Sequence, residues 1–256
     1  MTLSKNKPEL IRPDIFKEDD GIKAWFTCKN ADLYTKNQQI EGLNLGYNTA
    51  EEAEVVFRHR KELANLLNIN LQEVAFAEQV HGSGVQVVSK GGTYNGVDAL
   101  ISRTEGITLA IQVADCAAVL MADPGNRVIA AVHAGWRGAA DDIIPKTVDE
   151  MISLGMKPAD IKAFISPCIS QENFEVGEEV AERFPQQFVD YSTYKKPHVN
   201  LKGFLEDQLS KLGLKKSHIE VHQGCTVENA NRFYSYRREQ QASGRMLGVI
   251  GNTIKN

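Results

Sequence analysis

The sequence lacks the features that would place a protein in a membrane or on an anionic polymer. None of its apolar segments reaches the length of about 18 residues at which a helix begins to span a bilayer. Neither sign of charge forms a long block, and the formal net charge is -4 over 256 residues. Sequence-independent binding to nucleic acid or to an acidic membrane needs a concentrated basic surface. We therefore predict neither nucleic-acid binding nor membrane binding.

Cysteine is scarce and forms no CxxC pair, so the sequence does not predict a scaffold stapled by disulfides. The N-terminal segment has no continuous apolar stretch and is interrupted by Pro8 and Pro13, unlike a secretory signal. Both observations favour a reduced, cytoplasmic setting. In that setting each cysteine is either buried and inert or chemically employed. The four cysteines are Cys28, Cys116, Cys168 and Cys225.

Strand-like and helix-like stretches alternate from about residue 22 onward, with no internal repeat and no convincing domain boundary. The clearest helix covers residues 49–68, where Thr49 and Glu52 have capping-box spacing and an apolar stripe follows. Further helices are predicted over 141–154, 176–184 and 200–212. Strands are predicted over 22–27, 74–77, 85–89, 97–101, 108–114, 127–132, 161–165, 219–222 and 246–250. Connections of hairpin length and of helix length both occur, which predicts a mixed α/β domain. Residues 185–200 are predicted to form an exposed excursion.

Three short segments place reactive side chains beside apolar strands: QVHG at 79–82, ADC at 114–116 and HAGWRG at 133–138. If the strands 108–114 and 127–132 lie side by side, Cys116 and His133 reach one point, and His81 also belongs to a strand end. Two imidazoles and a thiolate suit Zn²⁺, and three protein ligands leave a position open for water. Such a water loses its proton near neutral pH and becomes a nucleophile. On spacing alone, isolated structural roles for these side chains remain an open alternative.

The segment after His133 has the pattern of an anion site. Gly135 and Gly138 flank Arg137 before a helix expected to open at Asp141 or Asp142. A glycine-containing turn at a helix N-terminus directs backbone N–H groups toward an anion, and Arg137 adds a forked cation. A tight turn with a surface arginine explains the same residues equally well.

Several other polar residues are weaker candidates. Asp98 and Asp115 are placed to orient a metal-bound imidazole or thiolate, or to accept a proton. Asn44 is expected to form a turn or to contact substrate, and Arg237, next to Arg238, to bind an anion or to lie on a solvated face. His59 is predicted to face the polar side of its helix. The remaining histidines have no partner motif and are predicted to be non-catalytic: His198, His218 and His222.

At these same residues the chain resembles the YfiH family, also known as the laccase-domain or multicopper polyphenol oxidase family. The motifs occur in family order between about residues 22 and 250. They are LNLG at 43–46, QVHG at 79–82, DAL at 98–100, ADC at 114–116, HAGWRG at 133–138, SPCI at 166–169, EVGEEV at 175–180 and SYRR at 235–238.

The resemblance implies a fold shared with the catalytic domain of cytotoxic necrotizing factor, a single-domain sandwich of mixed β-sheets flanked by helices. The domain would cover residues 22–256, after an N-terminal extension of residues 1–21. It also implies zinc, or alternatively copper, bound by His81, Cys116 and His133. The activities attributed to the family are phosphorolysis of adenosine, inosine and S-methyl-5'-thioadenosine to base and ribose 1-phosphate, and deamination of adenosine.

Combining the two arguments, we expect catalytic roles for His81, Cys116, His133 and Asp115. The residues expected to hold nucleoside or phosphate are Asn44, Gln79, Gly135, Arg137, Gly138 and Arg237. The chain departs from the family pattern at two places. Residues 27–31 read TCKNA where the family often has T-R-x-G-G, and Ala118 replaces a frequent proline. If the first loop helps to hold an anion, Lys29 substitutes as a point charge.

Three rival functions follow from the same residues. A copper-dependent polyphenol oxidase is one, although a single His/Cys/His set cannot supply the imidazoles of several coppers. A metal-free cysteine hydrolase would use Cys116 as nucleophile and His133 as base. A non-catalytic zinc-binding protein would have its fourth ligand position closed. We expect a monomer or a homodimer.

Overall fold

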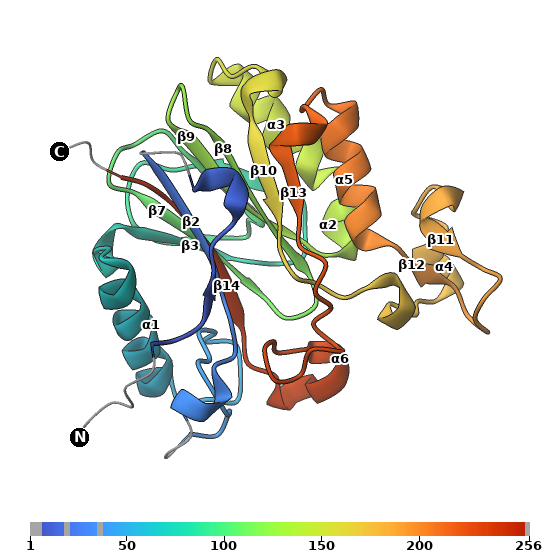
Figure 1. Ribbon diagram of the computed structural model, residues 1–256, viewed down its shortest axis with the longest axis horizontal. Helices are drawn as coiled ribbons and strands as arrows, with labels where there is room; N and C mark the ends of the chain where they lie inside the picture. The colour runs from blue at the N-terminus through green and yellow to red at the C-terminus, as the bar shows by residue number, and fades with distance from the viewer. Residues whose placement is uncertain (1–6, 18–20, 35–37, 254–256) are drawn as a thin grey trace.

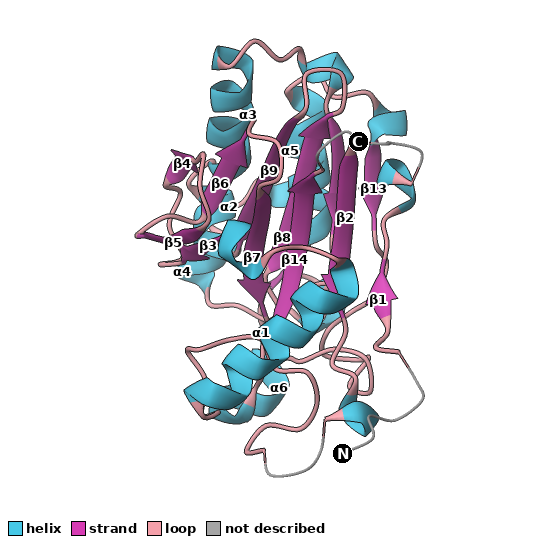
Figure 2. Ribbon diagram, turned by 90° about the vertical axis from the view of Figure 1, so that its left-hand side faces the viewer, coloured by secondary structure: helices cyan, strands magenta, loops and turns pink. Residues whose placement is uncertain are grey.

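Two six-stranded sheets stacked face to face form the centre of the protein, and helices cover both outer faces (Figure 1). The computed structural model describes residues 7–17, 21–34 and 38–253. Helix α1 (Ala53–Leu67) lies on one outer face, and Figure 2 shows it crossing in front of the sheet that contains β2 (Ile22–Thr27), β7 (Thr108–Val113) and β14 (Met246–Asn252). Helices α2 (Trp136–Ala140), α3 (Ile143–Ser153) and α5 (Leu201–Lys211) cover the other. The predicted single-domain mixed α/β sandwich is thus confirmed.

Sheet A is antiparallel from its β1 edge as far as β7 and parallel from β7 to β5. Its strands, in spatial order, are β1 (Leu10–Ile11), β2 (Ile22–Thr27), β14 (Met246–Asn252), β7 (Thr108–Val113), β3 (Val74–Glu78) and β5 (Gly92–Asn95).

Sheet B has an antiparallel centre and a parallel pair at each edge. Its strands, in spatial order, are β13 (Ile219–Val221), β10 (Lys162–Ile165), β8 (Ala117–Asp123), β9 (Val128–Ala134), β6 (Ala99–Ser102) and β4 (Val85–Val87). The remaining elements are a small sheet of β11 (Val189–Asp190) and β12 (His198–Val199), and the short helices α4 (Glu178–Ala181) and α6 (Tyr236–Glu239).

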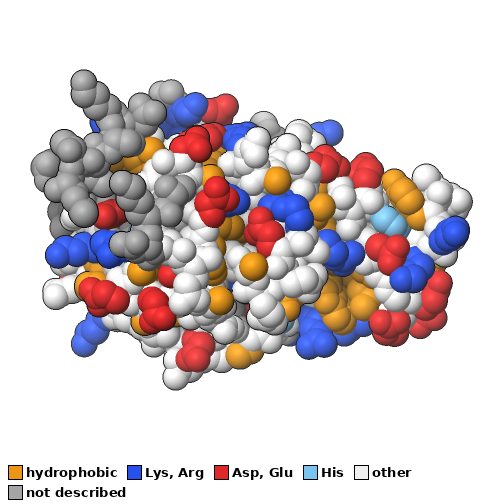
Figure 3. Space-filling model, turned by 90° about the horizontal axis from the view of Figure 1, so that it is seen from below, with side chains coloured by type: hydrophobic (Ala, Val, Ile, Leu, Met, Phe, Trp, Pro, Cys, Tyr) orange, Lys and Arg blue, Asp and Glu red, His pale blue; other side chains and the backbone are white. Residues whose placement is uncertain are grey.

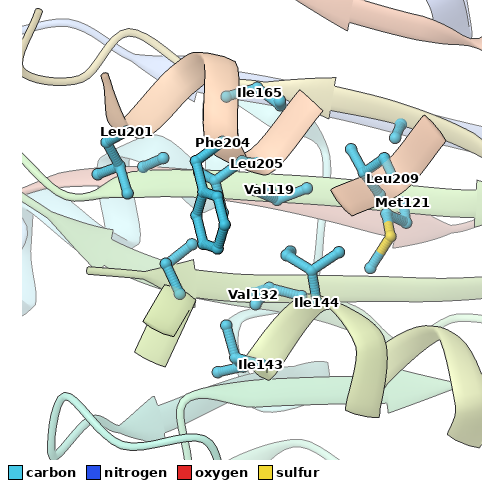
Figure 4. Close-up of a cluster of buried hydrophobic side chains, with 14 of the residues drawn as sticks. Val119, Met121, Val132, Ile143, Ile144, Ile165, Leu201, Phe204, Leu205 and Leu209 are labelled. Carbon is cyan, nitrogen blue, oxygen red and sulfur yellow. The ribbon is translucent and has the colours of Figure 1, made fainter. Parts of the chain in front are cut away.

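The two central strands of sheet B are buried along their whole length, because the other sheet covers one face and helices cover the other. Every residue of β8 and β9 is buried. On the helix-facing side, Val119, Met121 and Val132 pack in one cluster with side chains of α3 and α5 (Figure 4). The helix side chains of this cluster include Ile143, Ile144, Leu205 and Leu209. The sequence-based prediction missed β8, since a continuous apolar run has no two-residue alternation to mark it as a strand. It also missed β5.

Helix α1 starts later than its capping-box spacing predicted. The helix begins at Ala53, and the N-cap residue Glu52 makes no side-chain capping bond. Thr49 instead accepts a hydrogen bond from the Asn44 amide and donates one to the Gly46 carbonyl. The same loop draws in His59, whose Nδ1 lies 2.8 Å from the Asn44 carbonyl oxygen. His59 is therefore buried, and its prediction as a residue of the polar helix face was wrong.

The helix predicted over 141–154 is confirmed as α3, and the short helix α2, which was not predicted, precedes it. The two are separated at Asp142, which has a positive φ of 62°. The predicted helix over 176–184 shortens to the four residues of α4. Residues 191–196 are exposed, as predicted for the excursion, and β11 and β12 flank them.

Part of the predicted N-terminal extension packs onto the sandwich. Strand β1 pairs with β2, and Phe16 is buried with the side chains between the two sheets. None of the helices in the described part of the chain is both long and apolar enough to cross a bilayer.

Candidate functional site

The reactive side chains gather at one end of the sandwich, where the chain repeatedly passes from one sheet to the other. Residues 79–84 connect β3 of sheet A to β4 of sheet B, residues 96–98 connect β5 to β6, and residues 114–116 connect β7 to β8. The chain returns from β13 to β14 through residues 222–245. Met246 of β14 pairs with Val113 at the end of β7, which places this return at the same end.

Cys116 meets His133 through β8 and β9, and not through the strand pair expected from the sequence. Ala118 pairs with His133 across these adjacent strands of sheet B. Strand β7, which was expected beside β9, belongs to the opposite sheet. Cys116 comes directly before β8, so the register of one antiparallel pair brings the thiol to the imidazole.

The candidate metal ligands are His81, Cys116 and His133, whose ligand atoms lie within 4.8 Å of one another. The two imidazole rings are nearly perpendicular, with centroids 4.8 Å apart. Ligands of one tetrahedral zinc ion are roughly 3.3–3.8 Å apart, given zinc bonds of about 2.0–2.3 Å. Small side-chain movements therefore suffice for one ion to bind all three, and two nitrogens with a sulfur suit zinc or copper.

A single buried carboxylate, that of Asp98, holds both histidines in place. Its Oδ1 accepts hydrogen bonds from the His81 backbone N–H at 3.0 Å and from His133 Nδ1 at 2.6 Å. Its Oδ2 accepts bonds from the backbone N–H groups of Val80 and Gly82. The bond to Nδ1 leaves His133 Nε2 free to act as a ligand. The bonds from the backbone N–H groups to Asp98 also stabilise the turn in which His81 adopts a positive φ of 58°.

Glycine at positions 135 and 138 keeps space open around this centre. A Cβ at Gly135 would lie 2.9 Å from the Cys116 sulfur and 3.6 Å from a ring carbon of His81. A Cβ at Gly138 would lie 2.6 Å from the Gly82 carbonyl oxygen. Both glycines are therefore required by close packing around the candidate ligands.

The charged forms of Cys116 and His133 stabilise each other. Burial alone would raise the pKa of Cys116, but the charges and hydrogen bonds of His133 and His81 outweigh it and lower the pKa to about 6. Burial alone would lower the pKa of His133, but the Cys116 thiolate and Asp98 raise it to about 9. The pKa of Asp98 falls despite its burial, because His133 and backbone N–H groups stabilise the carboxylate. The thiolate is the form that binds metal ions.

Asp115 organises the wall of the site. Its Oδ1 accepts a hydrogen bond from the Thr226 hydroxyl at 2.6 Å, and its Oδ2 accepts one from the Arg237 backbone N–H at 2.6 Å. Asp115 has a positive φ of 85°. Both carboxylate oxygens are thus engaged in holding the return segment that carries Arg237.

An open cleft of about 1450 Å³ leads to the three ligands. Its aromatic side chains are Tyr47, Trp136, Phe174 and Tyr236, and its arginines are Arg237 and Arg245. Figure 3 views the molecule from the end where α6 lies, and positive and negative side chains are interspersed over the described residues of this face. The cleft thus combines aromatic and aliphatic side chains with a comparable set of polar and charged ones.

Not all the predicted substrate residues lie in this cleft. Gln79 and Arg237 line it, although the Gln79 amide exchanges two hydrogen bonds with the Gln112 backbone. Asn44 is fully buried, and its amide bonds Thr49, Gly46 and the Arg245 backbone. Arg137 is exposed, does not line the cleft and stacks on Trp136, 5.1 Å from the ring centroid.

The short helix α2 follows Gly135 directly, and the longer helix expected to open at Asp141 or Asp142 is α3, with Asp142 as its N-cap residue. The anion site expected at Gly135, Arg137 and Gly138 stays a prediction. Lys29, the substitute expected in the TCKNA loop, pairs with Glu41 at 2.8 Å. Sequence reasoning missed the cleft residues Trp136, Phe174, Tyr236 and Arg245. Trp136 and Tyr236 lie within the recognised motifs, whereas no pattern in the sequence marks Arg245.

Comparison with known proteins agrees with this architecture. A family model described as multi-copper polyphenol oxidoreductase laccase matches residues 23–253. The chain is 37% identical over 213 residues to a purine nucleoside phosphorylase of Deinococcus radiodurans, with 82% of each chain covered. It is 29% identical over 259 residues to adenosine deaminase RL5 of an unknown prokaryotic organism, covering 94% of this chain and 98% of that protein.

A solved structure shows the same fold. YlmD from Geobacillus stearothermophilus superposes with a TM-score of 0.88 at 27% sequence identity, covering 98% of this chain and 99% of that one. The chain therefore belongs to the multi-copper polyphenol oxidoreductase laccase family, the YfiH family.

Proposed function

We propose that this protein is a metal-dependent enzyme of purine nucleoside metabolism that works at the cleft above His81, Cys116 and His133. The observation that carries the proposal is the convergence of two imidazoles and a thiol at an open cleft. Relatives named purine nucleoside phosphorylase and adenosine deaminase support this substrate class. Among the described residues this is the single cluster of its kind, which favours one ion, as zinc or copper, over a multicopper centre.

Two reactions on one substrate class are proposed. In phosphorolysis of adenosine, inosine or S-methyl-5'-thioadenosine, a phosphate oxygen bonds to the anomeric carbon as the bond to the base nitrogen breaks. The base takes up a proton, and ribose 1-phosphate, or its methylthio analogue, is released. In deamination, water adds to the adenine carbon that carries the amino group, and ammonia leaves to give inosine. A bound zinc ion would supply Lewis acidity and lower the pKa of water at the site.

The protein's own residues would orient the reactants. Asp98 fixes the His133 ring through its hydrogen bond to Nδ1, and it holds the His81 backbone through its bond to the N–H group. The aromatic side chains of Tyr47, Trp136 and Phe174 offer faces on which a purine ring can stack. Asp115 holds the segment of Arg237 against the cleft and has both oxygens engaged there.

The test combines metal analysis with product chromatography. Protein purified without added metal is expected to contain about one zinc per chain and to convert adenosine to inosine, with phosphate-dependent release of free base. Cys116→Ala should lose the metal and both activities, since a lost ligand removes the thiolate that binds the ion. Cys28→Ala removes a buried thiol outside the cleft and serves as the matched control. Full turnover by Cys116→Ala would refute the proposal.

One observation favours a second candidate, a metal-free hydrolase. Cys116, His133 and Asp98 stand in the order of a nucleophile, a base and an orienting acid, with Asp98 Oδ1 2.6 Å from His133 Nδ1. Such an enzyme would keep its activity after exhaustive chelation and would be inactivated by thiol alkylation. Loss of activity on chelation, with recovery on adding zinc, excludes this candidate.

A further inference from the structure

The two arginines that line the cleft differ in what their guanidinium groups already bind. Arg237 donates Nη1 and Nη2 to the backbone carbonyl oxygens of Asn173 and Glu175. Arg245 donates only Nη1, to the carbonyl oxygens of Ser243 and Gly244 at 2.8 and 2.9 Å. Within the described part of the chain, Arg245 Nε and Nη2 have no hydrogen-bond partner, and no carboxylate forms an ion pair with this residue.

The free edge of Arg245 has the geometry that recognises an oxyanion. Nε and Nη2 are neighbouring donors that point the same way, so they can bind two oxygens of one tetrahedral anion. Neither atom belongs to the buried polar atoms that lack a partner, which means that solvent in the cleft reaches them. A guanidinium is positively charged at all relevant pH values, so the cleft carries a fixed cation that forms no ion pair with a carboxylate of the described residues.

The fold holds Arg245 in this place from three sides. Its backbone N–H donates to the buried Asn44 side chain at 2.9 Å. Its side chain crosses Gly46, where a Cβ would lie 2.4 Å from Arg245 Cγ, so a larger residue at 46 would block it. The guanidinium lies 5.8 Å from the Tyr236 ring centroid. The LNLG motif at 43–46 is thereby explained as a support for this arginine.

The position within the cleft also fits a role beside the reaction centre. Arg245 is close enough to Cys116 and Asp115 for their charges to act on it. The two oxygens of Asp115 are already occupied by Thr226 and the Arg237 backbone, so that carboxylate does not pair with the arginine. The other acidic residue that lines the cleft is Glu78.

Building on the proposed function, we propose that Arg245 binds the inorganic phosphate that attacks the nucleoside, through Nε and Nη2. Arg137, the arginine expected from the sequence, stacks on Trp136 outside the cleft lining. The anion site therefore belongs to the segment before β14, and Asn44 and Gly46 act as positioning residues for it.

The test measures base release from adenosine against phosphate concentration, together with deamination in the same samples. Arg245→Met should raise the KM for phosphate about 10- to 100-fold, the effect of a lost charge-assisted bidentate bond. The ratio of phosphorolysis to deamination should fall by a similar factor. Arg245→Lys keeps the charge without the fork and should fall between Arg245→Met and the wild type. Arg183→Met, an exposed arginine paired with Asp141, is the neutral control.

The outcomes separate this inference from the function on which it rests. If wild-type protein shows no phosphate-dependent base release, the phosphorylase function itself fails, whatever Arg245 does. If wild-type protein phosphorolyses adenosine and folded Arg245→Lys and Arg245→Met keep the wild-type KM for phosphate, the inference is overturned. A loss produced instead by Arg137→Met would return the site to α2. Thermal melting checks folding, and if Arg245→Met does not fold, Arg245→Lys decides alone.

A second measurement separates the two sources of a phosphate group. Calorimetric titration with inorganic phosphate, without nucleoside, should show binding to wild-type protein that Arg245→Met weakens at least about 10-fold. The same titration with adenosine 5'-monophosphate tests the phosphate of a nucleotide. If only the nucleotide binds through Arg245, the assignment of inorganic phosphate is wrong.

Discussion

The floor and the rim of the cleft are built differently. At the floor, Asp98 is fully buried and accepts four hydrogen bonds, and His133 is 3% exposed. At the rim, Tyr47 is 46% exposed and Tyr236 is 40% exposed. At the floor the Asp98 carboxylate anchors the His133 ring and the His81 backbone, whereas the rim presents aromatic faces to solvent.

This difference suits the floor to a reaction and the rim to binding a ligand. A reaction centre needs its groups fixed within fractions of an ångström, and burial with full hydrogen bonding supplies that precision. A binding rim needs surface that a ligand can cover, and aromatic rings provide it with few rotatable bonds. Arg245 combines both properties, because its backbone and one nitrogen are fixed while it lines the cleft with its other donors unbonded among the described residues.

The largest effect on this contrast is expected from Asp98→Asn. The new amide nitrogen would face backbone N–H donors whose hydrogen bonds the carboxylate now accepts. The pair between residue 98 and His133 would lose its negative charge. Breaking a buried charged pair costs about 3–5 kcal/mol, and metal affinity should fall about 10- to 100-fold. Denaturant unfolding and zinc titration measure the two losses. Asp123→Asn, a buried carboxylate at the far end of β8 that binds Asn126, should lower stability without changing zinc affinity.

A more local change at the floor is Gly135→Ala. The backbone at residue 135 has a φ of -78°, which alanine adopts freely, so the effect arises only from the new Cβ beside the Cys116 sulfur. Zinc affinity should fall about 10-fold, the order expected when a ligand's surroundings are displaced. Zinc titration measures it, and Gly125→Ala in an exposed turn is the control. Wild-type zinc binding in Gly135→Ala would show that the centre tolerates crowding there.

The smallest effect is expected at the rim, from Tyr47→Ala. Arg60 covers one face of this ring at 4.3 Å from its centroid, so the ring is held as a platform. Losing a base stacked on an aromatic ring costs about 1–3 kcal/mol, which should appear as a higher KM for adenosine with unchanged zinc content. Steady-state kinetics measures it. Tyr191→Ala, equally exposed at 46% but outside the cleft, should have no effect. An equal change in both variants would remove Tyr47 from the binding rim.

The sequence predicted the residues of the floor better than the way they meet. Each of the three side chains lies next to a glycine or an apolar strand, and such local patterns can be recognised in the sequence alone. These residues are His81, Cys116 and His133. Their pairing was mistaken, because β8 has no alternation and the sheet membership of β7 depends on contacts far along the chain. Asp98 was identified only as one of two carboxylates that could orient a ligand. The distinction from Asp115 requires knowing which oxygens bind which donors.

The sequence by itself determined the alternation of elements, the absence of a membrane-length apolar run, the three candidate ligand residues and the family resemblance, because these follow from composition and short-range pattern. Only the tertiary structure decided that Arg245 lines the cleft and that Arg137 does not. Arg137 sits in a conspicuous motif yet stacks on Trp136 outside the cleft, whereas Arg245 has no motif and faces it. The reason is physical: a side chain's direction is set by the packing of residues distant in sequence. Here Asn44 and Gly46, about 200 positions away, set the path of Arg245.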